Sequence, residues 1–186
     1  KYTITTGAET SFNLPIGQYV DYRDLIIAEN RLYVTKSDYS SLNVSTYIHS
    51  LQELNQTNGN VISNYNFTTS FPSSYSPESL TFNVITKEIF GISGNIIVKY
   101  NIQTGIESSF TMPIVQFTDY NDLIIGNNRL FITKRDYTNS SNYIHSLQEI
   151  NQTNGNLINN YNLTTTYPNN YSPESLNYDK ITNEIW

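Results

Sequence analysis

One long unit is written twice in this sequence. The segment Tyr2–Tyr39 aligns without a gap on Tyr100–Tyr137, so the period is about 98 residues. After a short deletion in the second copy, YIHSLQELNQTNGN matches YIHSLQEINQTNGN, and the motif YSPESL recurs at Tyr75 and Tyr171. A repeat this long and this similar restricts the chain to an architecture in which copies of one unit stack or form a ring.

Each unit contains two shorter patterns of strand, turn and strand. KYNIQTGIESSF, which begins at Lys99, echoes LQELNQTNGNVISNYNF, which begins at Leu51. Asn-Gly between alternating apolar runs is a strong hairpin signal, because both turn positions require a positive φ. Two further hairpins are predicted upstream, with turns at Glu29–Asn30 and Thr86–Lys87. Each half-unit therefore reads as four consecutive antiparallel strands.

The composition agrees with an all-β chain. Charged residues make up only 14% of the sequence, whereas tyrosine occurs 16 times. Tyrosine suits half-buried strands, where its ring packs and its hydroxyl group reaches water. Apolar residues show no 3.6-residue period, which argues against long helices.

The spacing of the predicted first strands indicates blades of a β-propeller. These strands are anchored by a leucine at about 50-residue intervals, and the four anchors are Leu25, Leu80, Leu123 and Leu176. The motifs KYNIQTG and QELNQTNG resemble the repeats of kelch, quinoprotein and similar propeller families over essentially the whole chain. The resemblance implies four-stranded blades around a central channel, and four blades resemble the hemopexin-like propellers in number.

The two chain ends are expected to build the last blade together. Residues 1–186 are interpreted as one domain, with repeat 1 at about 2–99 and repeat 2 at about 100–186. Trp186 aligns with Phe90 in a second strand and Lys1 with Lys99 in a third strand, so the C-terminus supplies two strands and the N-terminus the other two. Residues equivalent to Gly91–Val98 are missing at this join. The alternative is half of an eight-bladed ring, formed by a dimer or by a longer array.

Each predicted entry into an innermost strand carries a tyrosine and an acidic residue. In the resembling propellers this entry is a loop at the mouth of the central channel. The predicted ligand-binding residues are Tyr22, Asp24, Tyr75, Glu78, Tyr120, Asp122, Tyr171 and Glu174. A ring of the four carboxylates, Asp24, Glu78, Asp122 and Glu174, would suit Ca²⁺, Mg²⁺ or Na⁺. Alternatively, these carboxylates accept backbone N–H bonds at turns and hold no ion.

Charge and motif content narrow the function only to a broad class. The net charge of −6 argues against nucleic acid as a partner, and no apolar stretch predicts membrane insertion. The absence of cysteine excludes disulfides and metal–thiolate sites. We predict a non-catalytic recognition or scaffold propeller, extracellular or at the cell surface, that binds protein or carbohydrate as a monomer or homodimer. The alternative is a glycan-active hydrolase or lyase that uses the channel-mouth carboxylates.

Overall fold

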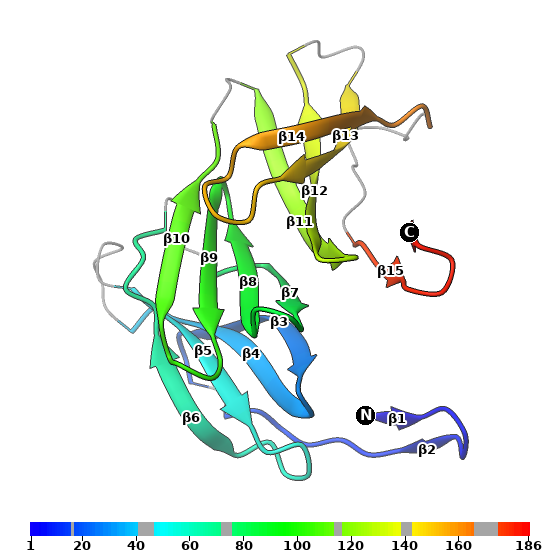
Figure 1. Ribbon diagram of the computed structural model, residues 1–186. Coiled ribbons are helices and arrows are strands. Elements are labelled where there is room, and N and C mark those ends of the chain that lie inside the picture. The colour runs from blue at the N-terminus through cyan, green and yellow to red at the C-terminus, as the bar shows by residue number, and fades with distance from the viewer. Residues whose placement is uncertain (16, 41–46, 72–75, 114–116, 139–142, 166–174) are drawn as a thin grey trace.

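The computed structural model describes residues 1–15, 17–40, 47–71, 76–113, 117–138, 143–165 and 175–186. Every helix-or-strand element within these ranges is a β-strand, which confirms the prediction of an all-β chain. The strands form three four-stranded sheets and two two-stranded hairpins (Figure 1).

The three four-stranded sheets are the blades that the repeat predicts. In each of them the strands follow one another in chain order and all neighbours are antiparallel. The first blade contains β3 (Val20–Ala28), β4 (Arg31–Asp38), β5 (Ile48–Leu54) and β6 (Val61–Asn66). The second blade contains β7 (Ser79–Asn83), β8 (Glu88–Ser93), β9 (Ile96–Asn101) and β10 (Glu107–Thr111). The third blade contains β11 (Thr118–Gly126), β12 (Arg129–Asp136), β13 (Ile144–Ile150) and β14 (Leu157–Asn162).

The first strands of the blades hold the blades together. Strand β7 packs against both β3 and β11, so the second blade lies between the other two, and Figure 1 shows the three following one another along an arc. One apolar cluster joins the first and second blades through Tyr33, Leu51 and Ile89. A second cluster joins the second and third blades, where Phe90 lies against residues that include Leu130. These clusters remove the apolar faces of the sheets from water, which is the main favourable contribution to folding.

The two ends of the chain form separate hairpins at the opening of the arc. Strand β1 (Tyr2–Thr3) pairs with β2 (Ala8–Glu9), and β15 (Tyr178–Asp179) pairs with β16 (Glu184–Ile185). Among the described residues no strand pairing joins β16 to β1, so the expected closure of a fourth blade by the chain's own ends is not seen. The molecule is a propeller-like arc of antiparallel blades rather than a closed sheet.

The hairpin turns agree with the sequence in position but not always in type. Glu29 and Asn30 both have positive φ, at 50° and 61°, as a two-residue hairpin turn of this type requires. The Asn-Gly prediction was wrong in detail, because within that turn only Gly59 has a positive φ, of 75°. There the loop is wider: the Gly59 amide donates to the carbonyl of Asn55 at 2.8 Å, and the Asn55 carboxamide accepts from the amide of Thr57. The asparagine side chain thus stabilises a longer turn than the Asn-Gly rule expects.

The segments that enter odd-numbered blades pack over these wide turns. A Cβ atom at Gly155 would lie 2.6 Å from the ring of Phe110, which lies in β10 shortly before the chain enters the third blade. The equivalent Gly59 faces the ring of Phe12 in the same way. Only glycine leaves room for the aromatic ring at both turns, so each segment is anchored to the blade that it precedes.

Candidate functional site

The predicted site residues fall on strands as well as loops. Tyr22 and Asp24 lie inside β3, and Tyr120 and Asp122 lie inside β11. The prediction of entry loops at these two positions was wrong, because β3 begins at Val20 and β11 at Thr118, before the tyrosine of each motif. Both strands contain a β-bulge, which in β3 lies between Tyr22 and Leu25. The bulge inserts one extra residue and re-aims the following side chain. Glu78 lies directly before β7, whereas Tyr75, Tyr171 and Glu174 lie outside the described residues.

Asp24 links the first blade to the second, and Asp122 links the third blade to the second blade and to the segment that leads into β15. The carboxylate of Asp24 accepts the amide of Leu25 at 2.8 Å and the amide of Leu80, in the second blade, at 2.6 Å. The carboxylate of Asp122 accepts the amide of Leu123 at 2.9 Å, the hydroxyl of Ser79 and the amide of Leu176. Both aspartates therefore make the backbone hydrogen bonds that the alternative without an ion expects. We call the two carboxylates with the amides of Leu80 and Leu176 the carboxylate latches.

The surroundings of Asp24 make its ionised form less favourable than in water. Burial raises the pKa of Asp24, the hydrogen bonds from Leu25 and Leu80 lower it in part, and the negative charge of Asp122 raises it further. Asp122 therefore lies close enough to Asp24 for its charge to act on it. Glu78 is exposed and forms an ion pair with Arg23 at 3.7 Å. Within the described ranges no three His, Asp or Glu side chains are grouped closely enough to hold a metal ion.

Tyr22 and Tyr120, the two described tyrosines of the predicted site, bind the segments that precede their own blades, whereas the aspartates accept amides from segments that follow. The hydroxyl of Tyr22 donates to the carbonyl of Pro15 at 3.0 Å, and the hydroxyl of Tyr120 donates to the carbonyl of Pro113 at 3.2 Å. Burial raises the pKa of both phenols. Each tyrosine thus fixes the segment that leads into its blade, and the structure does not bring it into hydrogen-bonding contact with the neighbouring aspartate.

Tyr120 also lines a small cavity that the sequence analysis missed. The cavity has a volume of about 140 Å³, and its walls come from the entry segment and the third blade. Its polar walls are Tyr120, Lys134 and Gln148, and its remaining lining residues are Met112, Pro113, Ile150, Gly155 and Leu157. The signal in the sequence is that Tyr, Lys and Gln recur at equivalent positions in the first repeat, as Tyr22, Lys36 and Gln52. Among the described residues, the buried Oε1 atom of Gln52 has no hydrogen-bond partner.

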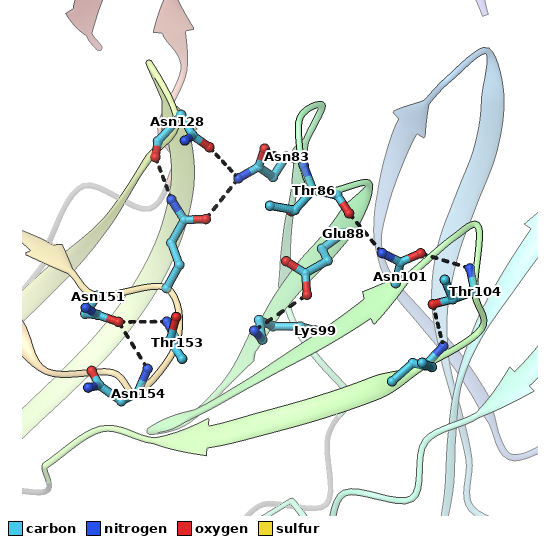
Figure 2. A network of polar contacts seen from close by, with 12 residues as sticks. Asn83, Thr86, Glu88, Lys99, Asn101, Thr104, Asn128, Asn151, Thr153 and Asn154 are labelled. Atoms are coloured by element: carbon cyan, nitrogen blue, oxygen red, sulfur yellow. Dashed lines mark hydrogen bonds and ion pairs between the residues drawn. The ribbon is translucent and has the colours of Figure 1, made fainter.

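A polar network joins the second and third blades at the other end of their first strands (Figure 2). The carboxamide of Asn83, at the end of β7, donates to Asn128 and to Gln152, each at 2.9 Å. Gln152 in turn donates to the carbonyl of Asn128 at 2.6 Å. The network fixes the turn between β11 and β12 against the second blade, and no sequence motif indicated it.

Comparison with known proteins gives no family. No protein-family model matches the sequence, and no curated protein matches it. Among the described residues no helix is long and apolar enough to cross a membrane. One solved structure that matches this chain is a europium-containing methanol dehydrogenase, with a TM-score of 0.49 and 10% sequence identity over 76% of this chain. The chain spans 25% of the length of that enzyme chain, and the similarity assigns it neither a family nor an activity.

Proposed function

We propose that this chain is a non-catalytic recognition or scaffold module that binds a protein or glycan partner. Its blades form a propeller whose last blade combines strands from the two termini, either of one chain or of two. Two features support a binding role. The aspartates expected at a catalytic channel mouth are used to hold blades together, and the repeat places the same tyrosine, lysine and glutamine in two blades. Two equal binding positions give avidity without any single strong site.

The cavity beside Tyr120 carries the proposal. It combines an aromatic wall with an amine from Lys134 and a carboxamide from Gln148, and these groups suit the ring, hydroxyl and carboxylate groups of a sugar or a peptide side chain. Its volume of about 140 Å³ is small, so a partner would insert one group there and make its other contacts on the surrounding loops.

The binding proposal is tested on glycan and peptide arrays with the intact chain. We expect selective binding, and we expect Lys134→Ala to weaken it about tenfold, because loss of one charge-assisted hydrogen bond changes the free energy of binding by about 1.4 kcal/mol. Lys180→Ala is the matched control, because Lys180 is exposed in the turn between β15 and β16 and lies outside the cavity. Equal weakening by both substitutions would contradict binding in the cavity.

Turnover on chromogenic glycosides separates binding from catalysis. The binding proposal expects no hydrolysis by the purified chain. Hydrolysis that disappears in Glu78→Gln would replace it with the glycan-active enzyme, because Glu78 is an exposed carboxylate beside Arg23. Hydrolysis that persists in Glu78→Gln but disappears in Glu174→Gln would lead to the same conclusion through the other predicted carboxylate.

We further propose a cation between the carboxylates of the first strands. Burial, and to a smaller extent the negative charge of Asp122, makes the ionised form of Asp24 costly and raises its pKa, a cost that a bound cation would offset. The hydrogen bonds to Asp24 and Asp122 leave carboxylate lone pairs that a hard cation can use. After chelation, we expect added Ca²⁺ to release or absorb heat in calorimetry and to raise the melting temperature, with Mg²⁺ and Na⁺ as comparisons. The response should be lost in Asp24→Asn. No heat and no change in melting temperature in the unmodified chain would end the cation proposal.

A further inference from the structure

Two repeat-equivalent strands differ sharply in exposure. Leu123 in β11 is 1% exposed, whereas its equivalent Leu25 in β3 is 64% exposed. In the same way Ile125 is partly buried, whereas its equivalent Ile27 is 59% exposed. The local sequences DLIIG and DLIIA are nearly identical, so the difference comes from the neighbour of each strand. Strand β7 lies between β3 and β11, so it covers β11 on the side of the preceding blade. Within the described residues no strand packs to that extent on the corresponding side of β3.

The contact of β7 with β11 shows which side-chain groups a strand that packs on β3 would need. The hydroxyl of Ser79 accepts the amide of Leu123 at 3.3 Å, and the hydroxyl of Thr81 accepts the amide of Ile125 at 3.0 Å. One residue pair further along, Asn83 enters the polar network with Asn128 and Gln152 that Figure 2 shows. Polar side chains two residues apart on β7 therefore satisfy backbone groups along β11.

The C-terminal hairpin and the residues just before it carry equivalent polar side chains that no described strand buries. Ser175, Asn177 and Asp179 are the repeat equivalents of Ser79, Thr81 and Asn83. Ser175 and Asn177 are exposed, whereas Ser79 and Thr81 are buried. Asp179 would meet Asn30 and Gln56, the equivalents of Asn128 and Gln152, and carboxamide groups can turn to donate to a carboxylate. The exposed surface of Ser175–Asp179, the segment that leads into β15 and ends with it, thus fits the uncovered face of β3.

The outer edge of the arc repeats this complementarity. Between the first and second blades, the carboxylate of Glu107 accepts the hydroxyl of Tyr65 at 2.9 Å and the amides of Thr68 and Thr69 at 2.8 Å each. Glu9, the equivalent of Glu107, is exposed on the N-terminal hairpin. Its matching donors are at the far end of the arc, on the third blade: Tyr161, which is exposed, Thr164 and Thr165.

We propose that a second copy of this chain joins both pairs of surfaces. In this junction β15 of one copy packs on β3 of the other, and Glu9 of the second copy receives the donors of the third blade. Strands β15 and β16 of one copy then share a composite blade with β1 and β2 of the other, as β8 pairs with β9 in the second blade. Figure 1 shows the two hairpins at the opening of the arc, where a partner has access to both.

Two such junctions, related by a two-fold axis, close two copies of the chain into a ring. The contact is heterologous, because the surfaces at the two ends of the arc are different. Both surfaces of both copies are covered only if the C-terminal end of each copy meets the N-terminal end of its partner. The result is a ring of eight blades, three complete ones and one composite blade from each copy. Closure within one chain would instead cover Leu25 and Ser175 in the folded monomer, where both are exposed. The junction is independent of the ligand proposal.

Light scattering with matched variants tests the junction. We expect the 186-residue chain to show about twice its mass of 21.3 kDa, and Leu25→Glu or Ile27→Glu to return it to the monomer mass without loss of β-sheet circular dichroism. Ile62→Glu is the control, because Ile62 is exposed and lies outside the proposed junction. Its equivalent Ile158 is also exposed, although the third blade already packs against the second. A monomer mass for the unmodified chain overturns the proposal, and so does dissociation by Ile62→Glu.

Cysteine cross-linking separates the two kinds of closure directly, because the chain contains no cysteine. Ile27 and Asn177 are the repeat equivalents of Ile125 and Thr81, which are in contact between the second and third blades. Cysteines at these two positions, Ile27→Cys and Asn177→Cys, would therefore be close together in the proposed junction. We expect a mixture of the two single variants to form a covalent dimer under mild oxidation. A double variant that cross-links within one chain, at the monomer mass, overturns the proposal in favour of a self-closed ring. Array binding by a monomeric variant would leave the recognition proposal standing, so the two proposals fail separately.

Discussion

Asp122→Ala is expected to lower the free energy of unfolding by about 3 kcal/mol, because a buried carboxylate with three donors is lost. The amides of Leu123 and Leu176 and the hydroxyl of Ser79 all donate to Asp122, which is only 8% exposed. The hydroxyl of Ser79 and the amide of Leu176 would lose this acceptor, and the amide of Leu123 would keep only its longer bond to Ser79, of 3.3 Å. Leaving such donors without an acceptor costs more than the hydrogen bonds themselves contributed. Urea titration followed by circular dichroism measures the loss.

Two comparisons make this prediction specific. Asp24→Ala is the matched variant in the first repeat, and we expect about half the loss, because Asp24 receives two amides and lies partly exposed. Asp122→Asn keeps the shape and one acceptor oxygen, so its loss should fall between that of Asp24→Ala and that of Asp122→Ala. Equal losses in Asp24→Ala and Asp122→Ala would contradict the view that the burial of the latch sets its contribution.

The blades were predictable from the sequence because their signals are local. Strand alternation, turn residues and a repeat with nearly identical copies give each blade the same strands in the same order, and the structure confirms three of the four four-stranded sheets that were expected. The leucine anchors Leu25, Leu80 and Leu123 all lie on the first strand of a blade, as expected. Local periodicity is sufficient for this level of the fold, since each blade is formed by consecutive strands.

The environment of each residue was not predictable from the repeat. Leu25 and Leu123 occupy the same position in the repeat, but only Leu123 is covered by a preceding blade. This difference depends on which segments meet in space, and no pattern within the unit records it. The candidate site shows the same limit. The acidic residues were identified, but the bulge that turns Asp24 and Asp122 towards the next blade has no sequence signature in these strands.

Breaking the ion pair between Arg129 and Glu149 is the second large effect that we expect. The side chain of Glu149 is 8% exposed, and its carboxylate accepts hydrogen bonds from two guanidinium nitrogens of Arg129, one of them at 2.7 Å, and from the side-chain carboxamide of Asn159. Arg129→Ala leaves this carboxylate buried with Asn159 as its remaining donor, and we expect a loss of about 2 kcal/mol at pH 7. The estimate is below the range for fully buried pairs because the guanidinium group is itself 46% exposed.

The pH dependence identifies the ion pair as the cause. The hydrogen bonds from Arg129 hold the pKa of Glu149 below its ordinary value, and burial opposes this only in part. A carboxyl group with a depressed pKa in the folded state stabilises the fold above its unfolded-state pKa, and this stabilisation is lost as the pH falls through the folded-state value. The difference between the unmodified chain and Arg129→Ala should therefore be full at neutral pH and shrink in acid below the ordinary glutamate range.

A conservative variant and the repeat both provide controls for this prediction. Arg129→Lys keeps the charge but loses the two-nitrogen contact, so we expect about half the loss of Arg129→Ala. Arg31→Ala should reproduce the effect in the first blade, because Arg31 makes the same contact with Glu53 and also lowers its pKa. A loss from Arg129→Ala that stays constant from neutral to acidic pH would instead assign the effect to the packing of Arg129 over the ring of Phe131, 5.0 Å from its centre.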